Sequence, residues 1–310
     1  MNPIYVLGSI NMDLVFEIER LPEKGETMQG KHFMMSPGGK GANQAVASAR
    51  QNAKTYMIGS LGGDPLSEKL LKTLEGYNVD TRHVSIHPEK TSGVAGILLE
   101  GGENRIITDS GANAHQDLSV IRSIIQQAQK ASLLIAQLEI PVEAVQTAFK
   151  EARDKGMTTI LNAAPAIPLP DELYPLIDIL VVNEGEARTL SGVDASDPAF
   201  INQAAKALMK KGARSLLFTL GEKGSLYIGD NGTIEVPAYT VEVKDTTAAG
   251  DTFIGVFAAA FAQGRPLEET LRRANAASAL TVQTLGAQRA IPEKETVDTF
   301  INTHTLDDKD

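Results

Sequence analysis

Strand and helix patterns alternate through the middle of the chain, and this alternation constrains the fold more than any other feature. Helix patterns over residues 117–130, 141–155 and about 198–211 are interleaved with apolar strand patterns at 133–138, 158–161, 177–182 and 215–219. Strands at this spacing, joined through helices, form parallel pairs with right-handed crossovers. We therefore expect an α/β fold with a doubly wound, mostly parallel sheet flanked by helices.

The two ends of the chain extend this plan. Residues 4–7 and 55–61 have the pattern of further strands, and the last part is predicted to be helical over 250–263, 266 to about 284, and 293 to about 302. Extended segments within approximately 11–36 and 91–109 suit a small sheet that projects from the main body. Because no long linker divides the chain, we expect a single domain over residues 1–310.

Composition excludes several classes of protein. The 310 residues contain 29 Lys and Arg against 39 Asp and Glu, a formal charge of −10, which disfavours binding to nucleic acid or an anionic membrane. The absence of cysteine excludes disulfides, thiolate metal sites and thiol nucleophiles. The first apolar run lacks the basic residues of a signal peptide, and the apolar segment after Asp251 is too short to span a bilayer. We expect a cytoplasmic protein.

The segment 245–251 is the strongest candidate for a catalytic motif. Ala248, Ala249 and Gly250 have almost no side chain and precede an apolar helix pattern, so their main-chain N–H groups can approach an anion at the positive end of that helix. Asp251 follows on the first turn, where a carboxylate can accept a proton from a hydroxyl. This pairing suits phosphoryl transfer to a hydroxyl, although small residues and an Asp are also ordinary at a helix start.

A second glycine cluster lies at residues 38–41, before another helix pattern. It lacks the GxxxxGK[ST] spacing of a phosphate-binding P-loop. Its glycines permit unusual backbone angles and close approach of a ligand, and Lys40 and Asn43 offer donors to sugar hydroxyls. A plain glycine turn is an equally good interpretation of this cluster alone.

Polar residues follow the predicted strands at one end, where open α/β sheets bind ligands. They are Asn11, Asp13, Glu139, Asn162, Asn183 and Thr219. Three of the polar residues here have a structural alternative: Asn11 could be a turn former, Glu139 a solvated carboxylate, and Glu186, just beyond the strand ends, a charge that complements a helix start. Their shared edge favours one functional crevice. The five histidines show no metal-binding spacing.

Five motifs, taken together, resemble the ribokinase branch of the carbohydrate kinases, a family that also includes fructokinases and adenosine kinases. In chain order they are Gly-Ser-Ile-Asn-Met-Asp (8–13), Gly-Gly-Lys-Gly-Ala-Asn-Gln-Ala (38–45), Gln-Leu-Glu (137–139), Asn-Glu-Gly-Glu (183–186) and Asp-Thr-Thr-Ala-Ala-Gly-Asp-Thr-Phe (245–253). The resemblance covers nearly the whole chain. It implies an ATP-dependent phosphotransferase that phosphorylates D-ribose at the 5-hydroxyl, giving ribose 5-phosphate and ADP.

The resemblance also implies a role for each matching position. Asp251 would be the general base, and Ala248, Ala249 and Gly250 would form the anion hole. The sugar would be held by Asn11, Asp13, Gly39, Lys40, Gly41, Asn43, Glu139 and Asp251. ATP would contact Asn183, Glu186, Thr219, Leu220, Gly221, Glu222, Lys223, Gly224, Gly250 and Asn275, with Glu186 positioning the Mg²⁺ shell.

A monovalent cation, usually K⁺, would lie beside the anion hole. The resemblance assigns it to oxygens around Asp245, Thr247, Thr281, Thr284, Gly286 and Ala290. Asn275, Thr284 and Ala290 depart from the residues common in the family, which leaves the preferred ion open. The small projecting sheet would be a lid over the sugar and the interface of a homodimer.

Other functions remain open from the sequence. A kinase for deoxyribose, fructose or adenosine is the nearest alternative, but Asn11 and Asp13 suit adjacent ring hydroxyls and aromatic residues are only 5% of the chain. A non-catalytic sugar-binding protein would not need Asp251 beside an anion hole. A dinucleotide-dependent dehydrogenase would need Gly-x-Gly-x-x-Gly after the first strand, which is absent.

Overall fold

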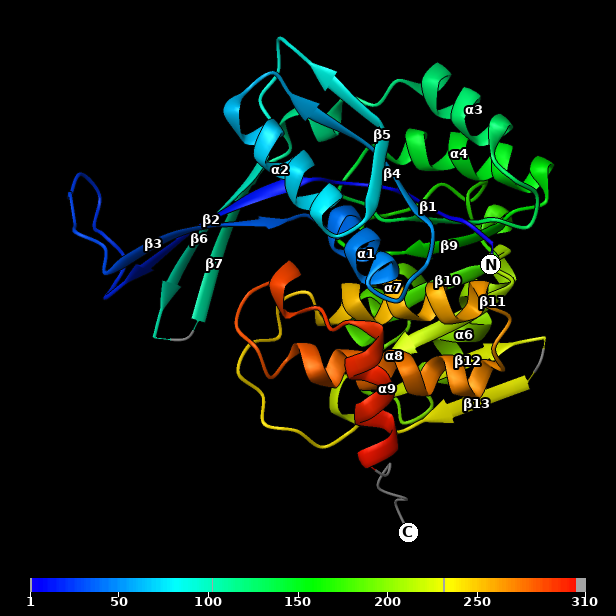
Figure 1. Ribbon diagram of the computed structural model, residues 1–310. Helices are drawn as coiled ribbons and strands as arrows, with labels where there is room; N and C mark the ends of the chain where they lie inside the picture. Colours follow the sequence, from blue (N-terminus) through cyan, green and yellow to red (C-terminus); the bar gives the residue numbers. More distant parts are fainter. Residues whose placement is uncertain (1, 102, 231, 305–310) are drawn as a thin grey trace.

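The computed structural model describes residues 2–101, 103–230 and 232–304, and within them a large mixed sheet forms the centre of the molecule. Its strand order is β13-β12-β11-β10-β9-β8-β1-β4-β5. The strands from β11 to β5 pair in parallel, and the β12–β13 hairpin adds two antiparallel strands at one edge (Figure 1). The expected doubly wound, mostly parallel sheet is confirmed. The strands are β1 (Ile4–Leu7), β4 (Thr55–Gly62), β5 (Val79–His87), β8 (Leu133–Ala136), β9 (Thr158–Asn162), β10 (Ile179–Asn183), β11 (Ser215–Thr219), β12 (Ser225–Gly229) and β13 (Gly232–Val236).

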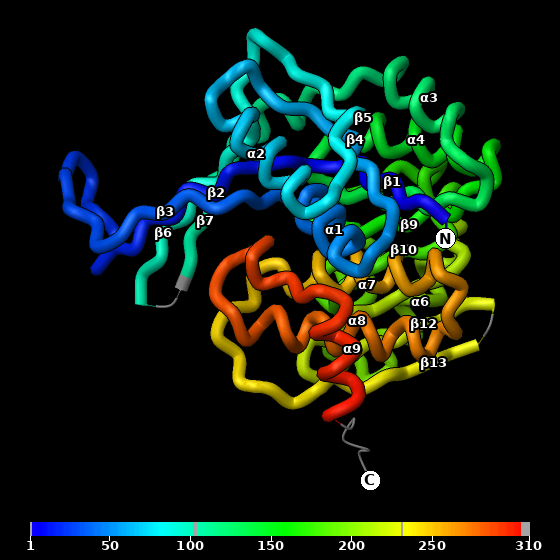
Figure 2. The backbone as a smooth tube through the Cα atoms, in the orientation of Figure 1, coloured from blue at the N-terminus to red at the C-terminus, as the bar shows by residue number. Residues whose placement is uncertain are grey.

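Helices cover both faces of this sheet. One face carries α3 (Leu118–Gln127), α4 (Val142–Lys155), α5 (Glu184–Ser191) and α6 (Phe200–Lys211), and the other carries α1 (Lys40–Ala49), α2 (Pro65–Gly76), α7 (Ala249–Ala262) and α8 (Leu267–Thr281). The alternation along β1 divides the two cores: Tyr5 and Leu7 pack with the first group of helices, and Ile4 and Val6 with the second. Figure 2 shows α9 (Lys294–Thr303) against α8, where Phe300 and Val297 join a third apolar cluster.

A separate small sheet projects from the body, as expected. It consists of β3 (His32–Gly38), β2 (Asn11–Ile18), β6 (Gly93–Glu100) and β7 (Glu103–Asp109) in the order β3-β2-β6-β7 (Figure 1). Its β2–β6 pair is parallel and the other pairs are antiparallel. Large apolar side chains on this sheet lie open to solvent, among them Phe33 at 55% and Ile107 at 73% exposure.

Several boundaries differ from the sequence-based expectation. The edge strands β5 and β13 were not predicted, because they are half-exposed and lack a continuous apolar pattern. Strand β12 lies between β13 and β11 and is mostly buried, but its apolar run is only Leu226–Ile228 and gives a weak signal. Helix α8 ends at Thr281 rather than near Thr284, because Val282 accepts main-chain hydrogen bonds from Lys244 and Asp245 instead of extending the helix. No helix among the described residues is long and apolar enough to cross a bilayer.

Candidate active site

The glycine cluster packs the start of α1 tightly against the connection from β1 to β2. Gly39 has φ +91°, and a β-carbon there would lie 2.8 Å from the main-chain N of Asn11. A β-carbon on Gly41 would lie 2.7 Å from the Gly8 backbone, and one on Gly38 would overlap the Asp13 carboxylate. These glycines are therefore required by close packing within the protein. They bring Lys40 and Asn43 next to the polar residues at the strand ends.

Asp251 is a buried carboxylate at the start of α7 with a donor on each oxygen. Asn43 Nδ2 donates to Asp251 Oδ2 at 2.9 Å, and Gln44 Nε2 donates to Oδ1 at 3.0 Å. Gln44 also donates to Asn162 Oδ1 at 3.1 Å and accepts from Gln137 Nε2 at 2.8 Å. Since Gln44 and Gln137 are fully buried, this network fixes the orientation of the Asp251 carboxyl group.

The small residues before Asp251 form the N-terminal end of α7. Ala248 adopts the left-handed conformation at φ 61°, ψ 8°. The described residues offer no acceptor to the main-chain N–H groups of Ala248 and Gly250, whereas Ala249 N donates to Thr246 O at 3.2 Å. A β-carbon on Gly250 would meet nothing within 4 Å. Two unpaired N–H groups and open space thus lie at the positive end of a long helix.

A cavity of about 200 Å³ joins these elements. It is lined by Lys40, Asn162, Ala164, Asn183, Glu186, Thr219, Thr246, Ala248, Gly250, Asp251 and Ile254. The lining residues come from the carboxyl ends of β9, β10 and β11, the start of α1 and the start of α7. The expectation that polar strand-end residues share one crevice is met for Asn162, Asn183 and Thr219.

Glu186 and Asp251 line this cavity together with Lys40, and the charges of Asp13 and Glu139 act on the same groups. Burial, together with the charges of Glu139 and Asp251, raises the pKa of Asp13 to about 7. Burial also raises the pKa of Asp251, although Lys40, Asn43 and Gln44 oppose it. Burial alone would lower the pKa of Lys40, but Asp251, Glu139 and Glu186 outweigh it and raise the pKa. These neighbouring carboxylates therefore favour a cation or hydroxyl donors beside them.

The remaining predicted sugar residues lie along β2 and the β8–α4 connection. Glu139 Oε2 accepts from Ser9 Oγ at 2.5 Å and from Lys40 N at 3.1 Å. Asn11 Oδ1 accepts from Asn113 Nδ2 at 2.7 Å. Asn113 also accepts a hydrogen bond from the main-chain N–H of Ile10 and donates one to the Ile10 carbonyl. Ser9 lies within the 8–13 motif but was given no role there, and Asn113 belongs to no recognisable sequence pattern, so neither was predicted.

The predicted nucleotide residues flank the same edge of the sheet. Asn183 caps α5 in a capping box with Glu186, each side chain accepting from the other's main-chain N–H at 2.8 Å. Burial raises the pKa of Glu186 even though this hydrogen bond and Lys40 oppose it. Glu186 is therefore both a helix-start residue and part of the cavity wall.

The segment after β11 is a tight turn. Leu220 N donates to Gly224 O at 2.8 Å across the short 3₁₀ helix Gly221–Lys223, which also contains Glu222. Lys223 lies 3.4 Å from Glu184. Asn275 does not line the cavity: its Nδ2 donates to Val236 O at 3.0 Å and Pro237 O at 3.1 Å, the segment packed against Gly224. Asn275 thus holds the segment that packs against this turn, on the side away from the cavity.

The predicted cation residues lie in and beside two loops that Asp245 connects. Its Oδ1 accepts from Thr247 N at 2.9 Å and its Oδ2 from Gly286 N at 2.8 Å. Burial would raise the pKa of Asp245, but these hydrogen bonds and the charge of Arg289 lower it. Thr284 N donates to Thr281 O, and Thr281 Oγ1 bonds Ala277 O and Thr252 Oγ1. Ala290 is buried in the 3₁₀ helix Gln288–Ala290.

Comparison with known proteins gives consistent results. The family model for the pfkB family of carbohydrate kinases matches residues 1–294. A ribokinase from Schizosaccharomyces pombe is 41% identical over 96% of this chain and 98% of its own length. A deoxyribokinase from Salmonella typhi is 34% identical over 96% and 98%. The structure of Arabidopsis thaliana ribokinase complexed with ribose and ATP superposes with a TM-score of 0.89 at 34% identity, covering 96% of this chain and 98% of that one.

Proposed function

The chain belongs to the pfkB family of carbohydrate kinases, and we propose that it transfers a phosphoryl group from ATP to the 5-hydroxyl of D-ribose. The observation that carries the proposal is the Asp251 carboxylate, buried beside two unpaired main-chain N–H groups and held by Asn43 and Gln44. A fixed base next to an anion site is what phosphoryl transfer to a hydroxyl requires.

Asp251 accepts the hydroxyl proton in this reaction. Its raised pKa makes it a stronger base than an exposed aspartate, while Lys40 keeps the charged form accessible. The N–H groups of Ala248 and Gly250 donate to oxygens of the transferred group as it passes through an in-line transition state. We assign Ala249 to the same anion hole, with its N–H released from Thr246 when the anion binds.

Sugar hydroxyls bind to the carboxylates and amides that lie beside the cavity, around Lys40 and Asp251. We assign this role to Asn11, Asp13, Lys40, Asn43 and Glu139, with Gly39 and Gly41 keeping the main chain close. Hydroxyl donors suit Asp13 and Glu139 because each carboxylate retains unused acceptor positions. Two adjacent polar side chains, Asn11 and Asp13, match the adjacent hydroxyls of ribose.

ATP occupies the edge formed by the ends of β10 and β11. The turn Leu220–Gly224 provides main-chain contacts for the nucleotide, and Asn275 maintains its shape. Mg²⁺ is usually bound through one or two carboxylates together with substrate phosphates and water. Glu186, in the cavity wall, fits that role, and the ion supplies charge neutralisation for the phosphates when bound.

K⁺ fits the loops 244–247 and 282–286. Both oxygens of Asp245 already accept main-chain N–H groups, so the ion would be held chiefly by carbonyl oxygens of Thr247, Thr281, Thr284, Gly286 and Ala290. Residue 247 is one position from Ala248. Ordering of these loops therefore fixes the anion hole.

The small sheet acts as the lid and as the interface of a homodimer. Its large apolar side chains are more than two-fifths exposed at five positions: Phe16, Phe33, Met34, Ile106 and Ile107. So much exposed apolar surface on one small sheet is unusual for a monomeric protein in water. A second copy covering this sheet would bury them. Sedimentation of the Ile107→Glu variant, compared with the unaltered chain, tests this: a dimer that survives the substitution argues against the assignment.

A kinase for 2-deoxyribose is the second candidate, because a deoxyribokinase is a full-length relative at 34% identity. A coupled ADP-release assay with ribose, 2-deoxyribose, fructose and adenosine side by side distinguishes them. We expect the highest kcat/KM with ribose. A preference for another acceptor would reassign the substrate, and sugar binding without ADP release would exclude catalysis.

A further inference from the structure

A second cavity, of about 610 Å³, lies at the amino-terminal ends of the central strands, opposite the catalytic cavity. It is lined by Arg153, Gly156, Met157, Thr158, Asp178, Ile179, Arg214, Ser215, Tyr227, Asp230, Phe261, Arg265 and Leu267. These residues include the amino-terminal ends of β9, β10 and β11, whose carboxyl ends carry Asn162, Asn183 and Thr219 in the catalytic cavity. Its volume is in the range of small-molecule sites.

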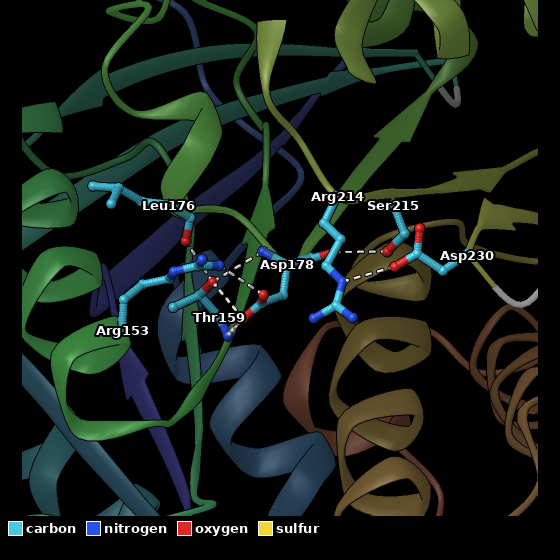
Figure 3. Close-up of polar contacts among 7 residues, drawn as sticks. All are labelled: Arg153, Thr159, Leu176, Asp178, Arg214, Ser215 and Asp230. Carbon is cyan, nitrogen blue, oxygen red and sulfur yellow. Dashed lines mark hydrogen bonds and ion pairs between the residues drawn. The ribbon is translucent and has the colours of Figure 1, made fainter. Parts of the chain in front are cut away.

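One ion pair in this cavity is structural. Asp178 Oδ2 accepts from Thr159 N at 2.9 Å and from Thr159 Oγ1 at 3.1 Å, and Arg153 Nη1 donates to Oδ1 at 2.9 Å (Figure 3). Ser215 Oγ and Thr159 Oγ1 bond the main chain of Asp178 as well. The side chain of Asp178 is therefore fully engaged: it forms a direct ion pair with Arg153, and its charge reaches Arg214 without a direct ion pair among the described residues.

Arg214 and Arg265 have spare donors. Arg214 uses only Nε, in a 3.0 Å bond to Asp230, and neither of its Nη groups has an acceptor among the described residues. Both members of this pair are 66% exposed, so water screens the pair and Arg214 can readily exchange Asp230 for another anion. Arg265 bonds Gln263 through Nε and Glu269 through Nη1, which leaves Nη2 without an acceptor in the described part of the chain.

The cavity also has an aromatic and apolar wall. Tyr227 is 8% exposed, and the described residues provide no hydrogen-bond partner for its hydroxyl. Phe261, Met157, Ile179 and Leu267 complete this side. Flat rings and guanidinium groups lining one cavity are the components that bind a ring carrying a negative charge.

We propose that this cavity is a second ligand site, and that it binds a small phosphate monoester with a flat ring. The phosphate is held by the free guanidinium donors of Arg214 and Arg265, and the ring lies against Tyr227 and Phe261. Phe261 is ten residues after Asp251 on α7, which separates the two sites by about 15 Å along the helix. The site is thus distinct from the proposed ATP and sugar positions.

Phenyl phosphate tests this directly, because it has the required ring and monoester but neither sugar nor adenine. Titration followed by amide NMR should shift signals of Ser215, Tyr227 and Phe261, with ATP and ribose binding unaffected. We expect Arg214→Ala and Arg265→Ala each to weaken binding tenfold or more, since each removes a charge-assisted hydrogen bond. Arg122→Ala, which alters an exposed arginine on α3, is the matched control and should bind normally.

Removing the competing carboxylate gives an independent test with the opposite sign. Asp230→Asn frees Arg214 and should tighten phenyl phosphate binding severalfold. Phenol should bind far more weakly than phenyl phosphate, and so should inorganic phosphate. The proposal is overturned by shifts confined to residues 40–44 and 248–252, by equal binding of phenol, or by arginine variants and Asp230→Asn that bind like the unaltered chain.

Discussion

Gln44 should determine the protonation of the catalytic base, although it does not line the catalytic cavity. It is fully buried in α1, donates to Asp251 Oδ1 at 3.0 Å and receives a hydrogen bond from Gln137 at 2.8 Å. The substitution Gln44→Met keeps nearly the same volume but removes the amide. Among the described residues, Asn43 is then the one side-chain donor that remains to Asp251.

The expected size follows from the lost bond. A hydrogen bond to a charged group contributes about 1.5–3 kcal/mol, and this loss falls on the ionised form of Asp251 alone. The pKa of Asp251 should rise further, so the acid limb of the kcat profile moves to higher pH. At a pH below the new limb, turnover should fall roughly 10- to 100-fold. It should recover in part as the pH is raised.

The assay is kcat against pH by coupled ADP release with saturating ribose and ATP. Gln51→Met is the control, because Gln51 is also a buried glutamine but bonds only the Pro292 carbonyl, away from the site. It should lose stability without moving the acid limb. If Gln44→Met lowers stability but leaves the acid limb where it is in the unaltered chain, the positioning role is refuted.

Three further outcomes are expected. The raised pKa of Asp13, about 7, means that the folded chain holds a proton that the unfolded chain releases near pH 4; stability should therefore fall as the pH rises between these values, by on the order of 2–4 kcal/mol. Urea unfolding across pH should show that Asp13→Asn lacks this fall, and an equally steep fall would contradict it. Gly250→Ala should stabilise α7 by about 0.5–1 kcal/mol yet lower turnover at least tenfold, because its β-carbon enters open cavity space; unchanged turnover would exclude phosphoryl binding there. K⁺ should raise the thermal midpoint relative to tetramethylammonium, and Asp245→Ala should remove this difference; a rise that persists in the variant would place the ion elsewhere.

The sequence predicted the fold well where burial and periodicity agree. Strands β8 to β11 and their helices have strong apolar patterns, and their order follows from alternation with helices. The edge strand β5 has no such pattern, because half of its side chains face away from the core. Strand β13 was missed for the same reason, whereas the buried strand β12 was missed because its apolar run is only three residues long.

The candidate site was predictable only in part. Asp251, Lys40 and Glu186 stand out in motifs, and the structure brings them to one cavity. Gln44 is followed by Ala45 and Val46 and has the character of a core position, so its bond to a residue 207 positions away has no local signal. The glycines at 38–41 were interpreted as making room for a ligand, whereas they also make room for Asn11 and Asp13 of the chain itself.

Turnover and ribose affinity of Asp251→Ala, measured on the same preparation, test the central claim most directly. The account predicts ribose binding near that of the unaltered chain, by calorimetry, with kcat lower by two or more orders of magnitude. A variant that binds ribose normally and loses less than tenfold in kcat would contradict the assignment of Asp251 as the base.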